Sequence, residues 1–384
     1  MKSVLLLLGT VGFSYMLNKI LLRFSKNFGV DSRQAQNIVR WASTSKPTTG
    51  GISFYITFLM GSLILMILRP DGILQSDTYL ALFLSASLAF MIGFADDAYG
   101  THPGLKFLGQ ICCGLILIGF GIHINFVATL YPALGFLDYF LTVFWVVGMM
   151  NSLNMLDNMD GVTTTIATTI CVIAMLMVIA TTGIHISNMY YVLIVICGGF
   201  MGFLYWNWKP AKVYMGDTGS MFIGLVVAYF GIIYFWNIET SPDNISPIRQ
   251  ILIPVMVFLV PIMDTTFVTV ARIARGSSPF VGGKDHLTHN LARIGITEEL
   301  VPLTLAIVSI VSGTMALYAY KLIPEWQPYY SEMFAIYPIV VFSIFTYFYV
   351  KGTRIQKMKE LMAERDREKQ QTITQEPVMG GLAN

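Results

Sequence analysis

The chain has 384 residues, of which 55% are hydrophobic and only 12% are charged, and its formal net charge is +2 at neutral pH. Soluble domains carry about 25% charged residues, so this composition excludes a water-soluble protein with an ordinary charged surface. We therefore expect lipid to surround much of the chain and predict an all-α integral membrane protein.

Eleven apolar stretches are each long enough for the ~20 residues that a membrane-spanning helix needs. The first could pass for a signal peptide, but no small-residue cleavage site follows it, which favours an uncleaved span. No repeat of fixed period joins the stretches, which weakens the case for a transporter built from duplicated halves. The predicted spans are residues 3–22, 50–68, 78–95, 105–123, 137–155, 162–182, 189–206, 218–236, 250–270, 301–321 and 333–350.

The distribution of basic residues predicts the orientation. With the N-terminus outside, 20 of the 24 Lys and Arg residues fall on the cytoplasmic side, as the positive-inside rule requires. An odd number of spans then leaves the C-terminus in the cytoplasm. We expect residues 1–350 to form one polytopic membrane domain and residues 351–384 to form a charged cytoplasmic tail, helical at first and disordered beyond about residue 371.

The second predicted span opens with Lys46-Pro47-Thr48-Thr49-Gly50-Gly51 on the cytoplasmic side. A lysine and hydroxyl groups placed before paired glycines suit contact with a nucleotide or a phosphate. An ordinary entry from loop to helix is the alternative interpretation.

An acidic pair, Asp96-Asp97, follows the third predicted span. An acid at membrane depth costs ~2.5–3.5 kcal/mol on insertion scales, so it needs a reason. Adjacent carboxylates can bind a divalent cation or hold a proton between them, although a polar helix boundary would look the same. Like every acidic motif described below, the pair lies on the side that Lys and Arg alone define as cytoplasmic.

Polar residues spaced three apart close the fifth predicted span. This spacing places successive side chains near one stripe of a helix. A stripe of amides and carboxylates that ends at Gly161 indicates a surface facing a ligand, whereas the alternative is a solvated loop. The stripe consists of Asn151, Asn154, Asp157 and Asp160.

The segment Gly216-Asp217-Thr218-Gly219-Ser220 begins the eighth predicted span. Exposed N–H groups at a helix start favour phosphate, and Asp217 could hold Mg²⁺ against that phosphate. The alternative is an ordinary Asp or Thr helix cap. In the next span Asp264 must face the bundle, where it would pair with Arg272 or another polar neighbour, or extend the site.

Two histidines, His286 and His289, lie three apart in the loop after the ninth predicted span. With the charged residues around them they suggest an anion-binding lid, and two histidines without cysteines give too few ligands for zinc. The charged neighbours are Asp285, Lys284, Arg272, Arg275 and Arg293.

Together these motifs resemble the polyprenyl-phosphate N-acetylhexosamine-1-phosphate transferase family. The resemblance runs from about Lys46 to Arg293 and depends on the order and spacing of five motifs. They are Lys46-Pro47-Thr48-Thr49-Gly50-Gly51, Gly93-Phe94-Ala95-Asp96-Asp97, Asn151 to Gly161, Met215-Gly216-Asp217-Thr218-Gly219-Ser220 and Asp285-His286-Leu287-Thr288-His289.

The resemblance implies transfer of N-acetylhexosamine 1-phosphate from a UDP-N-acetylhexosamine to polyprenyl (undecaprenyl) phosphate, with release of UMP, as the first membrane step of a cell-envelope glycan pathway. It implies Mg²⁺, with Mn²⁺ as an alternative, and a homodimer. It also implies a multi-pass protein of the bacterial inner membrane with its active site on the cytoplasmic face. We expect no nucleic-acid partner.

The resemblance also implies roles for individual residues. Asp217 matches the metal ligand, and Tyr214 lies where an aromatic ring stacks on uracil. Catalytic roles are implied for Asp96, Asp97, Asp157, Asp160, His286 and His289, with either member of the acidic pair as base or guide for the lipid phosphate. Substrate-binding roles are implied for Lys46, Thr48, Asn151, Asn154, Tyr214, Arg272, Lys284 and Arg293.

The histidine segment departs from one branch of the family. Members that handle the muramoyl-pentapeptide carry three histidines in a row, and here Leu287 and Thr288 interrupt any such run. This favours N-acetylglucosamine or a related N-acetylhexosamine as the sugar. Asn158 also replaces a frequent glycine, so the local turn can differ.

Three other classes compete with a transferase. A transporter or ion-coupled carrier would place acids at the bilayer midplane, where only Asp264 fits. A Mg²⁺-dependent prenyltransferase would carry Asp-x-x-x-Asp patches, which the spacing of Asp157 and Asp160 does not match. A non-catalytic scaffold gives no reason for the cytoplasmic cluster of acids.

Overall fold

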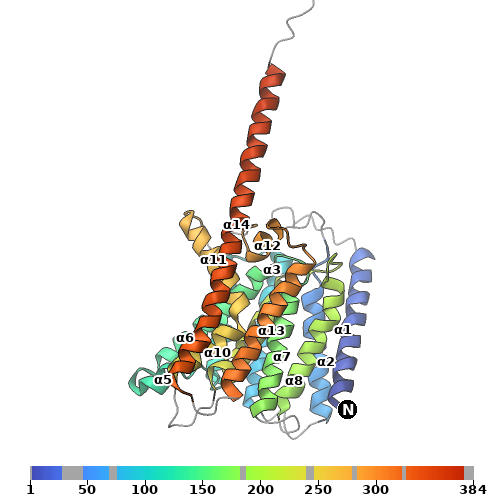
Figure 1. Cartoon of the computed structure of the whole chain (residues 1–384). Helices are drawn as coiled ribbons and strands as arrows, with labels where there is room; N and C mark the ends of the chain where they lie inside the picture. Colours follow the sequence, from blue (N-terminus) through green and yellow to red (C-terminus); the bar gives the residue numbers. More distant parts are fainter. Residues whose placement is uncertain are drawn as a thin grey trace, which may run out of the picture.

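The computed structural model describes residues 2–27, 46–68, 76–181, 187–238, 246–278, 283–321 and 326–375. Within these ranges every regular element is a helix, and the helices form one bundle (Figure 1). The predicted disorder after residue 371 falls largely outside the described residues, as do Arg33 and Arg40, two of the arginines predicted to be cytoplasmic.

All eleven predicted spans coincide with helices. Among the described residues, nine helices are long and apolar enough to cross a membrane, and the number is ten if a bent pair of helices is counted as one span. The long helices are α1 (Lys2–Asn27), α2 (Gly50–Leu68), α3 (Asp77–Tyr99), α6 (Leu137–Leu156), α7 (Val162–Thr181), α8 (Asn188–Asn207), α9 (Gly216–Gly231), α13 (Leu300–Lys321) and α14 (Pro328–Gln375). The π-helical turn η3 (Ile232–Trp236) extends α9. Three short helices lie in the connections between longer helices along the chain: α5 (Val127–Leu130), η2 (Pro132–Leu134) and α12 (Leu287–Arg293).

The predicted span 105–123 is a shorter helix, α4 (Pro103–Gly119), of 17 residues. It begins at a proline, and the Nδ1 atom of His102 caps it by accepting a hydrogen bond from the Gly104 N–H at 3.1 Å. Its end lies next to Gly121, whose φ of +78° is a left-handed conformation that ends helices. Local capping therefore limits the helix more tightly than hydropathy indicates.

The predicted span 250–270 is broken into α10 (Pro247–Val257) and α11 (Leu259–Ala274), which meet at an angle of 82°. Pro261 has no N–H to donate to the carbonyl of Val257, so the helical ladder cannot continue through Phe258. The bend matters for the site because α11 carries Asp264 and Arg272 to the end of the bundle where α12 lies (Figure 1).

Helix α9 lies at the centre of the bundle. In the most apolar 18-residue stretch of α9 and its extension η3, 89% of the residues are buried, compared with 17% in the corresponding stretch of α1 and 22% in that of α14. Small residues permit close packing on α9: a Cβ atom added to Gly224 would lie 2.6 Å from Cα of Met150 on α6. Since α9 contacts α2, α3 and α6, its first residues are held on several sides.

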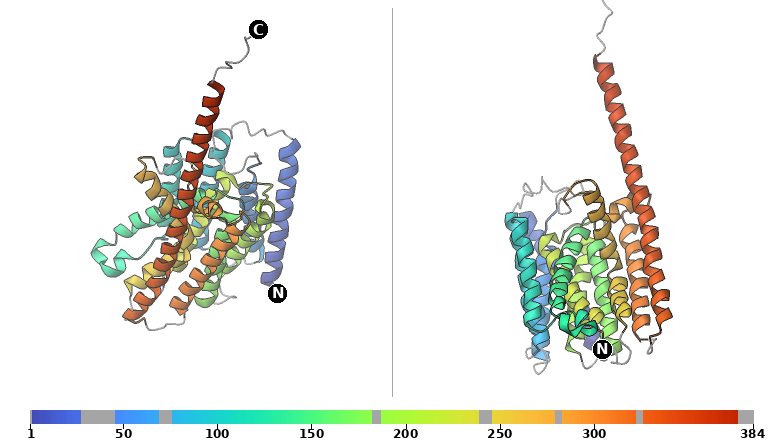
Figure 2. Two further views of the ribbon diagram at one scale, coloured as in Figure 1. Left: turned by 45° about the horizontal axis from the view of Figure 1, so that its top comes forward. Right: turned by 90° about the vertical axis from the view of Figure 1, so that its left-hand side faces the viewer.

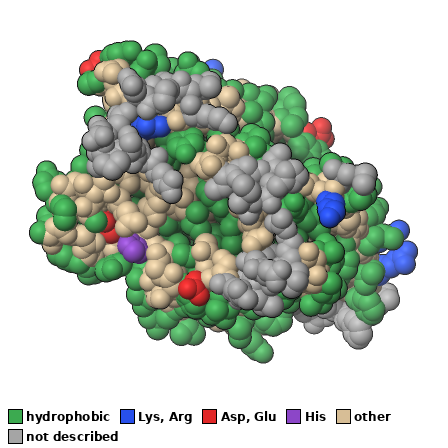
Figure 3. Space-filling view, turned by 90° about the horizontal axis from the view of Figure 1, so that it is seen from below, with side chains coloured by type: hydrophobic (Ala, Val, Ile, Leu, Met, Phe, Trp, Pro, Cys, Tyr) green, Lys and Arg blue, Asp and Glu red, His purple; other side chains and the backbone are tan. Residues whose placement is uncertain are grey.

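The start of α1 and the far end of α14 lie at opposite ends of the bundle (Figure 1). Helix α14 runs unbroken to Gln375 and projects beyond the bundle (Figures 1 and 2). At the opposite end, uncharged and hydrophobic side chains predominate among the described residues in view (Figure 3). The assignment of the α12 end to the cytoplasm stays a prediction from the distribution of Lys and Arg.

Candidate active site

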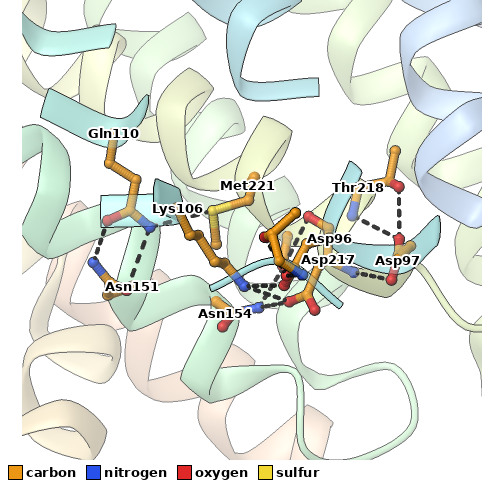
Figure 4. Close-up of polar contacts among 11 residues, drawn as sticks. Asp96, Asp97, Lys106, Gln110, Asn151, Asn154, Asp217, Thr218 and Met221 are labelled. Atoms are coloured by element: carbon orange, nitrogen blue, oxygen red, sulfur yellow. Dashed lines mark hydrogen bonds and ion pairs between the residues drawn. The ribbon is translucent and has the colours of Figure 1, made fainter. Parts of the chain in front are cut away.

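Four polar side chains from four helices meet at the α12 end of the bundle. Lys106, at the start of α4, places its Nζ atom 2.8 Å from Oδ2 of Asp96 and 3.0 Å from Oδ1 of Asp217 (Figure 4). Asn154 of α6 donates from Nδ2 to the same Asp217 oxygen and, at 2.8 Å, to Oγ of Ser220. The cluster therefore holds two carboxylates around one ammonium group.

Lys106 belongs to this cluster, although none of the sequence motifs includes it. Its side chain is 16% exposed and Asp96 is 14% exposed, whereas the Asp217 side chain remains 32% exposed. A lysine nine residues after an acidic pair, at the start of an apolar helix, is the signal that could have indicated it. Ion pairing compensates the two mostly buried charges, and Asp217 is the member of the cluster open to a ligand.

The two adjacent acids of α3, Asp96 and Asp97, have different hydrogen-bond partners. Asp96 accepts hydrogen bonds from the Thr101 N–H at 2.9 Å and the Thr101 hydroxyl at 2.6 Å, besides its ion pair with Lys106. Asp97 instead accepts from the N–H groups of Asp217 and Thr218 at 3.0 and 2.9 Å and from the Thr218 hydroxyl at 2.6 Å. The acidic pair is therefore placed at the site, but its members are not equivalent.

Glycines bring the backbones of α3 and α9 into contact at this point. A Cβ atom on Gly93 would lie 2.3 Å from the carbonyl oxygen of Asp217 and 2.5 Å from Cα of Thr218. Gly216 adopts a φ of +69°, which other residues rarely adopt. Both glycines belong to the predicted motifs, and their role is to let α9 begin directly against α3.

The polar stripe on α6 divides between this cluster and its surroundings. Asn151 donates to Oε1 of Gln110 on α4 at 2.7 Å, so its amide joins two helices. Asp157 follows the last residue of α6 and is half-buried. Asn154 donates a hydrogen bond to Asp217 and so joins the stripe to the cluster.

A second cluster surrounds Asp160, which is 7% exposed and accepts a hydrogen bond from the Ala211 N–H at 2.9 Å. Lys46 Nζ lies 3.8 Å from its carboxylate and also 5.1 Å from the centre of the Tyr214 ring. Lys209, which the motifs did not include, lies 3.9 Å from the same carboxylate. The structure therefore brings Lys46 and Tyr214 together beside Asp160. Thr48 is half-buried and follows Pro47, whose carbonyl accepts a hydrogen bond from the Tyr214 N–H at 2.9 Å.

The third cluster is the histidine segment, held by Asp264 of α11. The fully buried Asp264 places Oδ2 2.9 Å from Nδ1 of His286, and its Oδ1 accepts a hydrogen bond from the Leu287 N–H at 2.7 Å. Asp264 therefore pairs with the histidine segment and not with Arg272, the partner that the sequence also allowed. A carboxylate on one ring nitrogen fixes the orientation of the imidazole.

Arg272 is 4% exposed and makes a two-point contact with Asp285, in which Nε lies 3.1 Å from Oδ2 and Nη2 lies 2.7 Å from Oδ1. Arg275 donates to the same carboxylate. Burial opposes ionisation of Asp285, but its bonds to Arg272 and Arg275 outweigh burial and lower its pKa to about 2. Arg272 is thus a clamp for this segment rather than a free cation.

Arg293 and Lys284 are also tied to the segment. Arg293 donates to the backbone carbonyl of Lys284 and, at 3.0 Å, to Oδ1 of Asn290. From α14, the Tyr349 hydroxyl donates to the Asp285 carbonyl at 2.8 Å. These contacts hold the described part of the predicted lid on several sides.

His289 is 2% exposed, next to His286 with ring centres 5.6 Å apart. Burial lowers the pKa of His289 to about 3, and the charges of His286 and Arg293 act in the same direction. Its imidazole is therefore neutral near pH 7. Any positive charge that this segment offers to a phosphate must come from other groups.

The end of α6 joins the first and third clusters. Asn154 contacts Asp217, and four residues later Asn158 accepts a hydrogen bond from the Thr288 hydroxyl on α12. One helix end therefore fixes the spacing between the acidic cluster and the histidine segment.

Among the described residues, no group of three or more His, Cys, Asp or Glu side chains could hold a metal ion by itself. Mg²⁺, however, usually binds through one or two carboxylates together with substrate phosphates and water. The partly exposed Asp217 and its neighbour Asp96 fit that kind of site.

Comparison with known proteins supports the same interpretation. The sequence profile of glycosyl transferase family 4 matches residues 79–235. The chain is 32% identical over 234 residues to a phospho-N-acetylmuramoyl-pentapeptide-transferase of Staphylococcus carnosus, a match that covers 56% of this chain and 70% of the relative.

Two further relatives are named for N-acetylglucosamine. A probable undecaprenyl-phosphate N-acetylglucosaminyl 1-phosphate transferase of Bacillus subtilis is 27% identical over 300 residues, which are 77% of this chain and 78% of the relative. A decaprenyl-phosphate N-acetylglucosaminephosphotransferase of Mycobacterium leprae is 29% identical over 283 residues, which are 68% of this chain and 70% of the relative.

Proposed function

The chain belongs to the polyprenyl-phosphate N-acetylhexosamine-1-phosphate transferase family, and on that premise we propose that it transfers N-acetylglucosamine 1-phosphate from UDP-N-acetylglucosamine to undecaprenyl phosphate and releases UMP. The reaction would open a cell-envelope glycan pathway on the cytoplasmic face of a bacterial inner membrane. The assembly of Asp96, Lys106, Asn154 and Asp217 at one end of the bundle is the observation that carries the proposal.

The chemistry needs charge neutralisation more than covalent help from the protein. A phosphate oxygen of the lipid attacks the phosphorus that bears the sugar, and the bond from that phosphorus to UMP breaks. Catalysis of such transfers depends mainly on positioning and on stabilisation of the anionic oxygens. Mg²⁺ held by Asp217, with Asp96 nearby, would supply much of that stabilisation when bound.

Lys106 and Asp96 have complementary roles in this proposal. The ammonium group lies between Asp96 and Asp217, so it balances their charge and can donate to a phosphate that approaches the exposed side of Asp217. Asp96 would guide the lipid phosphate or accept its proton. Asp160, Lys46 and Tyr214 form the proposed contact with the uridine part of the donor.

The proposed donor depends on the histidine segment. Asp285-His286-Leu287-Thr288-His289 lacks three successive histidines, and Thr288 uses its hydroxyl to bond Asn158. The two relatives named for N-acetylglucosamine support this choice of sugar. Because another relative is named for the muramoyl-pentapeptide, an assay must also include UDP-muramoyl-pentapeptide as a donor.

Release of UMP by protein purified in detergent tests the proposal. Undecaprenyl phosphate and Mg²⁺ would be supplied with UDP-N-acetylglucosamine, UDP-N-acetylgalactosamine or UDP-muramoyl-pentapeptide in separate reactions. We expect release with UDP-N-acetylglucosamine only when the lipid phosphate and Mg²⁺ are both present. Release with another donor alone would reject the proposed sugar and keep the reaction class.

A further inference from the structure

The carboxylate of Asp97 is directed at the backbone of α9. Its three hydrogen bonds all come from the first turn of that helix: the Asp217 N–H at 3.0 Å, the Thr218 N–H at 2.9 Å and the Thr218 hydroxyl at 2.6 Å. Figure 4 shows these bonds on the far side of Asp217 from Lys106 and Asn154. Both oxygens of Asp97 are therefore used within the protein.

These N–H groups need an acceptor from outside their own helix. The first amides of any α-helix have no carbonyl partner within it. In α9 the residue at the cap position is Met215, whose side chain makes no capping hydrogen bond. Asp97 therefore supplies from α3 the cap that α9 lacks, and its negative charge also suits the positive end of the helix dipole.

The fit leaves little room around the Asp97 carboxylate. A Cβ atom added to Gly216 would lie 2.4 Å from Oδ2 of Asp97. Gly93, which is on α3 with Asp97, packs directly against the backbone of Asp217 and Thr218. The neighbouring Asp217 carboxylate points the other way, toward Lys106 and Asn154. The carboxylates of Asp97 and Asp217 therefore lie on different sides of the α9 backbone.

We propose that Asp97 is a positioning residue, which caps the first turn of α9 and thereby sets where the Asp217 carboxylate lies. Asp96 is then the member of the acidic pair that faces the reacting groups. The catalytic part of this inference rests on the proposed function, whereas the capping part does not.

The capping part is tested without substrate or metal. Hydrogen–deuterium exchange of the Asp217 and Thr218 amides, resolved to single residues by mass spectrometry, would be compared among wild type, Asp97→Asn and Asp96→Asn. Asp97→Asn replaces one acceptor oxygen by an NH₂ group that faces N–H donors, so exchange at the two amides should rise by about tenfold or more. The matched control Asp96→Asn, which touches no amide of α9, should leave their exchange as in wild type.

The catalytic part is tested by a double-mutant cycle with Thr218→Val, which removes one of the three bonds and keeps the backbone amides. For Asp97→Asn we expect the Mg²⁺ concentration for half-maximal turnover to rise by roughly 10-fold to 100-fold, as for residues that orient a metal ligand. If Asp97 acts through Thr218, adding Thr218→Val to Asp97→Asn should change turnover by less than about twofold. In the wild-type background, Thr218→Val should reduce turnover by a factor several times larger than it does in the Asp97→Asn background.

Each outcome decides the inference. Unchanged amide exchange in Asp97→Asn, or fully additive effects in the cycle, would overturn it, because Asp97 would then act directly on substrate or metal. Faster exchange with wild-type turnover would show a cap that the reaction does not need, which also overturns it. If wild type released no UMP from any donor, the proposed function would fail while the exchange data still decided whether Asp97 caps α9. If Asp97→Asn did not fold, Thr218→Val would replace it in the exchange comparison.

Discussion

Asp264 and His286 are 22 residues apart, on α11 and at the start of α12, and Oδ2 of the aspartate lies 2.9 Å from Nδ1 of the histidine. Because the other carboxylate oxygen accepts from the Leu287 N–H at 2.7 Å, a single buried acid fixes both the ring and the backbone of the histidine segment. An acid that hydropathy alone would treat as an anomaly within a membrane span thus has a definite structural partner.

Substitution of Asp264 should separate the role of this acid in folding from its role in catalysis. Asp264→Ala leaves two buried donors without an acceptor, which costs about 1–3 kcal/mol for each group. Asp264→Asn can still accept from Leu287, but its NH₂ group would donate to Nδ1 of His286 and reverse the histidine tautomer. We expect a marked fall in the unfolding temperature for Asp264→Ala. For Asp264→Asn we expect a small fall but at least about a tenfold loss of turnover. Equal turnover in Asp264→Asn and wild type would show that the tautomer of His286 is irrelevant.

Loss of the ammonium group between the two acids should abolish most of the activity. In Lys106→Met the carboxylates of Asp96 and Asp217 repel each other without compensation, and a phosphate loses a positive donor. We expect turnover to fall by about 100-fold or more, with Lys106→Arg partly active. UMP release by Lys357→Met, which alters an exposed lysine of the projecting helix, is the control and should match wild type. A Lys106→Met enzyme with more than half of wild-type turnover would contradict this role.

The neutral state of His289 predicts a specific pH dependence of stability. Its pKa in the folded protein is about 3, below the ordinary value of 6.5, so the unfolded state binds a proton more readily. Stability from this group is therefore complete above pH 6.5 and is lost as the pH falls toward 3. Thermal unfolding from pH 7 to pH 4 should show a steeper loss for wild type than for His289→Asn. Parallel curves for the two proteins would show that His289 binds a proton as readily in the folded state as in the unfolded state, so that its pKa is not lowered by folding.

The contact between α3 and α9 should tolerate no side chain. In Gly93→Ala the new Cβ would meet backbone atoms of Asp217 and Thr218 at 2.3–2.6 Å, and a backbone cannot rotate away as a side chain can. We expect loss of nearly all turnover and a lower unfolding temperature. Gly148→Ala on α6 is the matched control because nothing lies within 4 Å of its added Cβ. It should be neutral or stabilise by up to about 1 kcal/mol, and comparable damage in both variants would reject the packing argument.

The helices were predictable because lipid leaves so few choices. Every long apolar stretch of the sequence became a helix, since the bilayer interior offers no partner for open backbone groups. What hydropathy missed were local events: the early end of α4 beside Gly121 and the 82° bend between α10 and α11. These depend on caps and on proline positions, which average out in a hydropathy window.

That the acids and amides of the candidate site lie at one end of the bundle was also predictable, because they lie at the ends of the predicted spans. The partners within it were not. The division of labour between Asp96 and Asp97 arises from the close approach of α3 to α9 at Gly93, and the place of Lys106 depends on where α4 begins. The burial that makes His289 neutral is likewise set by the tertiary contacts of α12, which a two-residue gap between histidines does not reveal.

Turnover of purified Asp217→Asn tests the central claim most directly. UMP release from UDP-N-acetylglucosamine would be measured with undecaprenyl phosphate across a range of Mg²⁺ concentrations, beside wild type and with thermal unfolding to confirm the fold. The proposed role of Asp217 predicts a folded variant with almost no release at any Mg²⁺ concentration. Near-normal release by the folded variant would contradict it and remove Asp217, with the cluster around it, from the catalytic site.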